Sequence, residues 1–336
     1  MKTSQLSFRT IVSMFALFVF LTVPGLIGAS DKDGVNKASY FMYVGTYTQE
    51  GGSTSKGIYV YRYDPGSAKV TSIGVAAQTI NPSFLAVNPN HRFLYAVNEV
   101  ANYQGQKSGA VSAFAIDSAT GKLTLLDEVA SGGADPCYIT VDKTGKFVLV
   151  ANYTGGSVSV FPVLQDGRLG EAAAFVQHTG HGTNPKRQEA PHAHSIDLSP
   201  DDRFAIVDDL GLDKTLVYKF DSSKGSLTLN DPPFAKADAG AGPRHFALHP
   251  NGKFAYVIHE MGSTVSVFDY DAAGGVLHPV QTISTIPQGF AGQNNDDAEI
   301  EVHPSGKFLY ASNRGHDSIA VFAIDPNKGT LTLIEY

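Results

Sequence analysis

The sequence is poor in cysteine and has no excess of basic residues, and both features exclude classes of protein. Cys137 is the single cysteine among 336 residues, so no intramolecular disulfide can form and packing must stabilise the fold. Lysine and arginine number 25 against 32 aspartates and glutamates. This acidic balance supplies no positive field for a phosphate backbone, and no helix-turn-helix, zinc-finger or RNA-recognition signature is present. We therefore expect no nucleic acid partner.

Long hydrophobic runs are also scarce, and one lies near the N-terminus. Lys2 and Arg9 precede an apolar run over residues 11–23, and small residues follow at 28–30. With about 13 residues, this run is short for a membrane span, which needs about 20. The pattern predicts a signal peptide over residues 1–30, export to the periplasm or the extracellular space, and no stable membrane association after cleavage. A retained N-terminal anchor is the alternative.

The rest of the chain repeats itself about every fifty residues, a period typical of propellers and other repeat folds. Each repeat contains short strands of alternating apolar and polar residues, separated by turns rich in glycine, asparagine and aspartate, and no sustained helical period occurs. Five copies begin at Val87, Val141, Leu198, Leu248 and Val302, and a degenerate sixth copy begins at Ser39. Residues 31–336 are therefore predicted to form one all-β domain, a β-propeller of four-stranded antiparallel blades.

The visible repeats do not by themselves account for a closed ring. The first repeat has no innermost strand within residues 31–38, and the chain stops at Tyr336 soon after a fourth strand. Propellers usually close by pairing the two termini within one blade, and neither end offers the missing strand. We therefore expect six repeats and a chain that is short of about one C-terminal blade. A complete six-bladed ring is the alternative.

Comparison of equivalent positions separates residues that serve the fold from candidates for a site. One constant aromatic position is assigned to the core: Phe93, Phe147, Phe204, Phe254 and Phe308. Two other places vary between copies. The start of the innermost strand has Ser83, Cys137, His194, Arg244 and Ala298, and the next column has Phe84, Tyr138, Ser195, His245 and Glu299. The end of the second strand has Glu99, Tyr153, Leu210, Glu260 and Arg314, preceded by the column Asn98, Asn152, Asp209, His259 and Asn313. Because neighbouring strands are antiparallel, these variable columns lie at the same end of the blade and face one mouth of the central channel.

This geometry gathers imidazole, guanidinium and carboxylate groups from several repeats at one rim, and such groups suit binding of a small anionic molecule and proton transfer. The rim set consists of His194, Arg244, His245, Glu260, Glu299 and Arg314. A long loop before the fourth repeat adds further polar residues at the mouth. We assign to substrate binding His192, His245, Glu299, Lys186 and Arg187. Each member also has a structural alternative, since a histidine can simply bond to backbone and an Arg–Glu pair can hold adjacent strands.

Metal, cofactor and nucleophile signatures are missing from the chain. The histidine spacing fits no standard zinc template, so we expect no metal. Residues 240–242, Gly-Ala-Gly, lie in a strand context without a following helix and therefore do not form a dinucleotide loop. No G-x-S-x-G motif occurs, and Cys137 is interpreted as a packed small residue. No cofactor is expected.

Several segments together resemble the lactonases of the seven-bladed β-propeller class, which include the propeller type of 6-phosphogluconolactonase and carboxy-cis,cis-muconate cyclase. The resemblance runs from about residue 40 to the end and rests on YVGTYT at Tyr43, NPSFLAVNP at Asn81, NPKRQEAPHAHS at Asn184, GAGPRH at Gly240, HE at His259 and AEIEVHPSGKFLYASNRGHDSIAVF at Ala298. It implies seven blades and an active site of one histidine, two arginines and one glutamate. By motif these are His194, Arg244, Glu260 and Arg314, the residues that the variable columns indicate.

The resemblance implies hydrolysis of a sugar-type lactone without a metal. Arg244 and Arg314 would hold an anionic group of the substrate and stabilise the oxyanion, while His194 or Glu260 would act as general base on water. Because export places the protein outside the cytoplasm, an unphosphorylated aldonolactone is a more plausible substrate than a phosphorylated one. Two alternatives stay open: a non-catalytic secreted binding propeller, and an enzyme of the muconate-lactonizing type.

Overall fold

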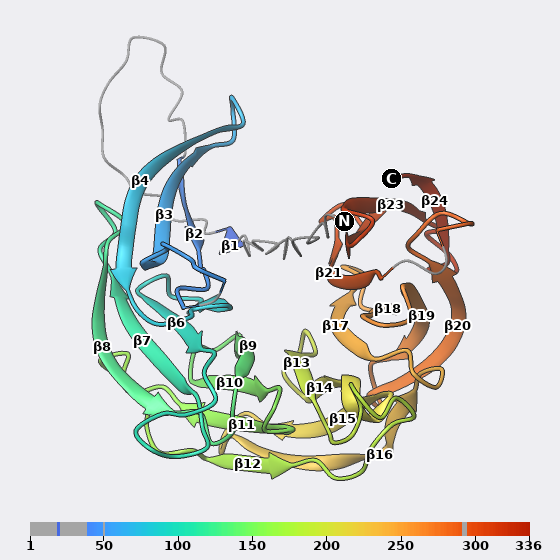
Figure 1. Cartoon of the computed structure of the whole chain (residues 1–336), viewed down its shortest axis with the longest axis horizontal. Helices are drawn as coiled ribbons and strands as arrows, with labels where there is room; N and C mark the ends of the chain where they lie inside the picture. The colour runs from blue at the N-terminus through green and yellow to red at the C-terminus, as the bar shows by residue number, and fades with distance from the viewer. Residues whose placement is uncertain (1–18, 21–38, 50, 291–293) are drawn as a thin grey trace, which may run out of the picture.

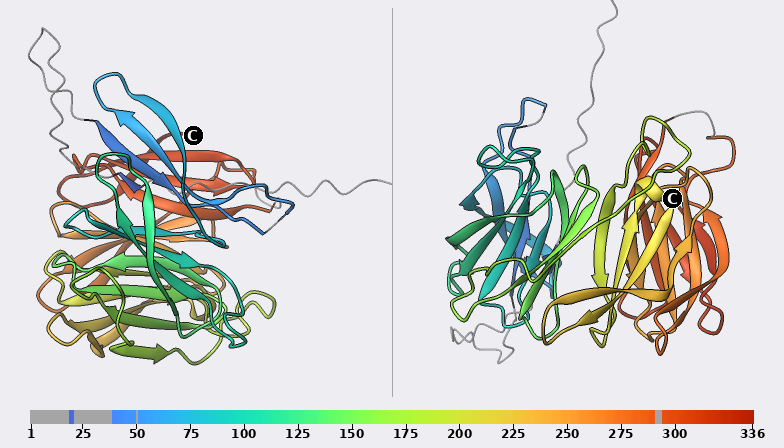
Figure 2. Two further views of the ribbon diagram at one scale, coloured as in Figure 1. Left: turned by 90° about the vertical axis from the view of Figure 1, so that its left-hand side faces the viewer. Right: turned by 90° about the horizontal axis from the view of Figure 1, so that it is seen from below.

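The computed structural model describes residues 19–20, 39–49, 51–290 and 294–336. These residues form six four-stranded antiparallel sheets that follow one another around a common centre (Figure 1). Two further views show the sheets standing next to each other around this ring (Figure 2). The described helical structure is a single 3-10 turn, η1 (Leu210–Leu212), and no described helix is long and apolar enough to span a membrane. The architecture confirms the predicted all-β propeller and its six repeats.

Each sheet uses four strands that are consecutive in the sequence, and the first of the four lies innermost. The bounds, sheet by sheet, are β1 (Val19–Phe20), β2 (Tyr40–Val44), β3 (Gly57–Asp64), β4 (Lys69–Gln78); β5 (Leu85–Val87), β6 (Phe93–Asn98), β7 (Ala110–Ile116), β8 (Leu123–Ala130); β9 (Pro136–Val141), β10 (Phe147–Asn152), β11 (Ser157–Pro162), β12 (Ala174–Gln177); β13 (Ala193–Leu198), β14 (Phe204–Asp209), β15 (Lys214–Asp221), β16 (Ser226–Lys236); β17 (Pro243–Leu248), β18 (Phe254–His259), β19 (Thr264–Asp271), β20 (Val276–Ser284); β21 (Asp296–Val302), β22 (Phe308–Arg314), β23 (Ser318–Ile324), β24 (Leu331–Glu335).

The first sheet contains an innermost strand that the repeat pattern did not predict. Val19 pairs with Tyr43 and Phe20 with Met42 in antiparallel register. The expectation that the first repeat lacks this strand is therefore wrong for the described residues. The physical reason is that the inner edge of β2 presents unpaired backbone groups, which an extended apolar segment can satisfy. Apart from these two residues, the predicted signal peptide over residues 1–30 lies outside the described residues.

The hydrophobic core lies between neighbouring sheets rather than inside any one of them. The second strand of the four central sheets is buried along its whole length, which agrees with the apolar residues at its first four positions. Side chains from β10 and β11 of one sheet pack against β13, β14 and β15 of the next, and the same arrangement recurs between the other neighbours. Radial packing of this kind sets the positions of the innermost strands around the ring.

The constant phenylalanine packs under a glycine turn of the following sheet in four of the five repeats that carry it. Gly225, in the turn between β15 and β16, has a φ of +70°, and a Cβ built there would lie 2.4 Å from the ring of Phe147. Equivalent contacts join Phe93 to Gly167, Phe204 to Gly275 and Phe254 to Gly329. Phe308 differs, because its side chain is 36% exposed and no following sheet covers it within the described chain. Its assignment to the core is therefore corrected.

Candidate active site

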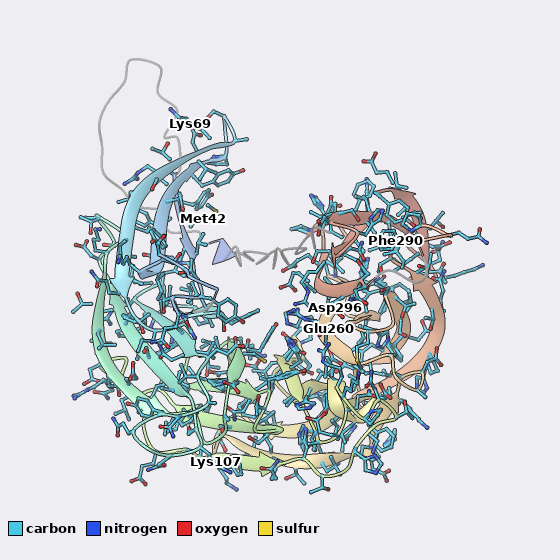
Figure 3. All side chains as sticks on the ribbon, in the orientation of Figure 1. Met42, Lys69, Lys107, Glu260, Phe290 and Asp296 are labelled. Carbon is cyan, nitrogen blue, oxygen red and sulfur yellow. The ribbon has the colours of Figure 1, made fainter. Side chains whose placement is uncertain are left out.

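A cavity of about 1000 Å³ lies where the innermost strands begin and the second strands end. The residues of the predicted set that line it are Arg187, His194, Arg244, His245, Glu260, Glu299 and Arg314. Glu260 lies near the centre of the ring, close to Asp296 of the neighbouring sheet (Figure 3). The structure therefore brings together, at one rim, side chains from sheets that are far apart in the sequence.

Two β-bulges, one in each of two neighbouring sheets, place His194 and Arg244 at the cavity. The register between β13 and β14 shifts between Ala193 and Ser195, and the register between β17 and β18 shifts between Pro243 and His245. The extra residue is His194 in one sheet and Arg244 in the next. Because a bulge bends the strand and redirects the inserted side chain, it separates these residues from the normal inward and outward alternation.

A glycine turn fixes Arg244 beside Glu260. Gly242 has a φ of +68°, and a Cβ there would lie 2.8 Å from the Met261 Cε atom. Its backbone N–H donates to Asp213 Oδ1 at 2.9 Å, and its carbonyl accepts from the Glu260 N–H at 2.8 Å. The GAGPRH motif therefore ties the start of β17 to the end of β18, which places one arginine and one glutamate of the site next to each other.

Glu260 is the centre of a charge cluster. Its Oε2 atom accepts from Arg244 Nε at 2.9 Å and lies 2.9 Å from Arg314 Nη2, while Oε1 accepts from Arg187 Nη2. The Nε2 atom of His194 lies 3.7 Å from the same Oε2. The Glu260 side chain is only 6% exposed. One buried carboxylate thus holds three guanidinium groups at the wall of the cavity.

The electrostatics of this cluster leave Glu260 ionised and His194 neutral. Burial acts to raise the pKa of Glu260, but Arg244 and Arg314 outweigh it and bring the pKa well below its ordinary value. Burial, aided by Arg244 and His245, lowers the pKa of His194 well below its ordinary value. Three guanidinium groups therefore converge on the Glu260 carboxylate at neutral pH, and this local concentration of positive charge favours an anionic ligand or a developing oxyanion.

Next to this cluster lies a second hydrogen-bonded group, formed by Arg244, His245 and Glu299. Arg244 Nη1 lies 3.1 Å from His245 Nε2, and His245 Nδ1 lies 3.0 Å from Glu299 Oε1. Because the guanidinium only donates, Nε2 must accept, so the ring proton of a neutral His245 is on Nδ1 and is donated to Glu299. Burial, followed by Arg244, lowers the pKa of His245 well below its ordinary value, in agreement with this neutral form.

Two of the residues assigned to substrate binding do not line the cavity. His192 is buried and stacks on Tyr153 with ring centroids 4.6 Å apart, and its Nδ1 atom lies 3.1 Å from the Tyr153 carbonyl oxygen. Lys186 is exposed on the loop beside Arg187. Stacking on Tyr153 and a contact with its backbone carbonyl therefore account for His192, in agreement with the structural alternative that a histidine can simply bond to backbone. The loop orients Arg187 rather than Lys186 toward the cavity.

Sequence reasoning left Tyr153 and Asp296 out of the site. The Tyr153 hydroxyl accepts from Arg187 at 3.3 Å, and its ring meets His194 edge-on with centroids 5.4 Å apart. Tyr153 belongs to the variable column at the end of the second strand, so the signal was present. Asp296 lies 3.9 Å from Arg187 Nη1, and no pattern in the repeats indicates it.

Cys137 is buried beside the site, and burial raises the pKa of its thiol well above the ordinary value. Its Sγ atom donates to the His194 carbonyl oxygen at 3.3 Å. A packed thiol of this kind is a poor nucleophile, as the sequence indicates. Among the described residues, no group of three or more histidine, cysteine, aspartate or glutamate side chains is placed to hold a metal ion.

Comparison with known proteins agrees with this architecture. The family model described as lactonase, 7-bladed β-propeller, matches residues 41–336. A 6-phosphogluconolactonase of Bacillus subtilis is 39% identical over 297 residues, which cover 88% of this chain and 81% of the relative. The crystal structure of a putative 6-phosphogluconolactonase from Bacteroides fragilis has a TM-score of 0.82 and 37% identity, and the match covers 91% of this chain and 83% of that one.

A periplasmic gluconolactonase of Pseudomonas aeruginosa gives a TM-score of 0.81 and 34% identity, with 88% of this chain and 82% of that chain covered. The family description names seven blades, and the described residues form six four-stranded sheets. The resemblance found in the motifs is thereby confirmed. The chain belongs to the lactonase family with the seven-bladed β-propeller fold.

Proposed function

We propose that this protein is a lactonase that opens the ring of a sugar-type lactone by adding water to the ester bond. The observation that carries the proposal is the convergence of Arg187, Arg244 and Arg314 on the single carboxylate of Glu260 at the cavity wall. The names of the relatives, 6-phosphogluconolactonase and gluconolactonase, support the same reaction class.

The cluster suits this chemistry because negative charge develops on the carbonyl oxygen when water attacks a lactone. Guanidinium groups that are already fixed in place stabilise such an oxyanion without reorganisation during the reaction. Arg244 also donates to the Ala298 carbonyl oxygen at 2.8 Å, and Arg314 donates to the Asp297 carbonyl oxygen at 3.1 Å, so both are held from two sides. In this proposal Glu260 positions the arginines, and Arg244 and Arg314 contact the substrate.

We infer that the substrate is an unphosphorylated aldonolactone met outside the cytoplasm. The basic, apolar and small-residue succession over residues 1–30 supports export, and the similar Pseudomonas aeruginosa protein is described as periplasmic. A phosphorylated sugar lactone belongs to the cytoplasm and would not reach an exported enzyme. The proposed lactone hydrolysis does not depend on this choice of substrate, because the 6-phosphogluconolactonase relatives, as their name states, act on the phosphorylated lactone.

The test is the rate of ring opening of glucono-δ-lactone and of its 6-phosphate, measured by base uptake at constant pH and compared with the spontaneous rate. We expect acceleration of at least one lactone, with a higher kcat/KM for the unphosphorylated one. Acceleration of the 6-phosphate alone would contradict the inferred substrate and leave the reaction class intact. No acceleration of either lactone would contradict lactonase activity and favour a binding propeller.

A further inference from the structure

We propose that Glu299 is the acid–base residue of ring opening and that His245 is its positioning residue. The inference rests on the proposed function and assigns the proton transfer to a different side chain from Glu260 and His194, the two bases that the sequence suggests. The inference follows from a comparison of the hydrogen bonds that Glu260, His194 and Glu299 make within the protein. Only Glu299 combines an anchored oxygen with a second oxygen that water in the cavity can reach.

Glu299 is anchored through one oxygen atom and open at the other. Its Oε1 atom accepts from His245 Nδ1 at 3.0 Å and from the Ile300 N–H at 3.1 Å, and its own backbone N–H donates to Ser312 Oγ at 2.8 Å. Oε2 has no hydrogen-bond partner recorded among the described residues. The side chain lines the cavity and is 33% exposed, so a water molecule in the cavity can reach Oε2.

The two other candidate bases are less suited to proton transfer near neutral pH. Both oxygens of Glu260 accept from guanidinium groups, which also hold its pKa well below the ordinary value and so make the carboxylate a weak base. His194 directs Nε2 toward Glu260 at 3.7 Å, and its Nδ1 lies 3.8 Å from Cys137 Sγ. Burial, aided by Arg244, also lowers the pKa of His194 well below its ordinary value, so its neutral imidazole is a weak base.

The surroundings of Glu299 suit a group that must both take and give a proton near neutral pH. Burial raises its pKa to about 7, against the opposing effect of Arg244. The titratable and charged groups that face it are Arg244 and His245 from β17, Glu301 from its own strand, Tyr138 from β9 and Asp197 from β13. A pKa near the working pH gives the best compromise between a base that is ionised and an acid that still donates.

The reaction is balanced with this one carboxyl group. Ionised Glu299 takes a proton from water as the water oxygen bonds to the lactone carbonyl carbon, and Arg244 and Arg314 stabilise the oxyanion. When the intermediate collapses, the bond between this carbon and the ring oxygen breaks, and protonated Glu299 gives its proton to that oxygen. The products are a hydroxyl group and a carboxylic acid, which releases its own proton to solvent. His245 keeps Glu299 oriented throughout and does not touch the substrate.

The experiment compares Glu299→Gln with the matched variant Glu301→Gln in the full chain. Glu301 lies two residues along the same strand, is more exposed and lines the same cavity, and burial together with Glu299 raises its pKa to about 7 as well. After subtraction of the spontaneous rate, we expect kcat of Glu299→Gln to fall about 100-fold or more with little change in KM. We expect the wild-type activity to rise with pH around 7, from the pKa of Glu299, and this rise to be lost in Glu299→Gln. Glu301→Gln is expected to keep the rate and the rise, which moves slightly to lower pH because a neighbouring negative charge is removed.

His245→Phe is a second variant that tests the positioning role and guards against a folding defect in the first. Loss of the Nδ1–H donor removes a hydrogen bond that favours ionised Glu299, so the rise in activity is expected to move to higher pH. If Glu299→Gln is folded and keeps the wild-type rate and pH profile, or if Glu301→Gln loses the rise instead, the inference is overturned while lactonase activity stands. Absence of activity in the wild type itself would overturn the proposed function.

Discussion

His194 in β13 and Arg314 at the end of β22 approach the same atom, Oε2 of Glu260, at 3.7 Å and 2.9 Å. His194, Glu260 and Arg314 belong to three successive sheets, and radial packing brings them together at a common rim. The relationship excludes an arrangement in which these residues open onto opposite faces of the ring. It also explains why the charge cluster is both a structural contact between sheets and a candidate site.

Removal of the central carboxylate is expected to lower stability in a pH-dependent way. Glu260→Gln leaves three guanidinium groups without their shared partner, and we expect a loss of about 3 kcal/mol in the free energy of unfolding at pH 7. The pKa of Glu260 is lowered in the folded state, so its contribution is complete above the unfolded pKa of about 4.3 and is lost as pH falls toward the folded pKa. Urea unfolding of wild type and variant at several pH values measures this difference. A difference that stays constant from pH 7 to pH 3 would contradict the account.

Contacts between sheets predict a specific cost for alanine at the glycine turns. Gly225→Ala adds a methyl group 2.4 Å from the Phe147 ring at a residue with a φ of +70°. Gly252→Ala is the matched control, since Gly252 has the same φ and no atom within 4 Å of the added Cβ. We expect Gly252→Ala to cost about 1 kcal/mol from backbone strain, and Gly225→Ala about 2 kcal/mol more from the clash. Equal midpoints in urea unfolding would show that the phenylalanine contact does not stabilise the ring.

Arg187 is expected to contribute to binding of the anionic product. It reaches the cavity from the loop, contacts Glu260 and Tyr153, and keeps 37% of its side chain exposed. Arg187→Ala is expected to weaken competitive inhibition by gluconate about tenfold, which corresponds to the loss of one charge-assisted hydrogen bond. Arg168→Ala is the control, because Arg168 is an exposed arginine that pairs with Asp166 and does not line the cavity. An unchanged inhibition constant in Arg187→Ala would remove Arg187 from the binding site.

The repeats made the fold and much of the candidate site predictable. Positions that serve packing are alike between copies, as Phe147 and Phe204 are, whereas positions at the rim differ, as His194 and Arg244 do. Strand direction then placed both variable columns at one end of the blades. These inferences need only the period of the repeat and the antiparallel rule, and both are properties of the chain itself.

Other features depend on three-dimensional contacts that no pattern in one sequence encodes. The bulges at His194 and Arg244 arise from register shifts between strands. The second oxygen of the Glu260 carboxylate finds its partner in Arg187, which lies on a loop outside the repeat pattern. Phe308 obeys the core pattern but is 36% exposed, since its burial requires a following sheet. Periodicity predicts which residues share a rim, and it does not predict which of their atoms are already bonded.

The most direct test of the central claim is a double-mutant cycle on kcat/KM for lactone hydrolysis with Arg244→Ala, Arg314→Ala and the double variant. If both arginines act as one oxyanion site around Glu260, each single change lowers kcat/KM about 100-fold or more, and the double variant loses much less than the product of the two factors. Circular dichroism and unfolding midpoints establish that the variants are folded. Multiplicative losses, or single variants with the wild-type kcat/KM, would contradict the claim that side chains from two sheets form one catalytic unit.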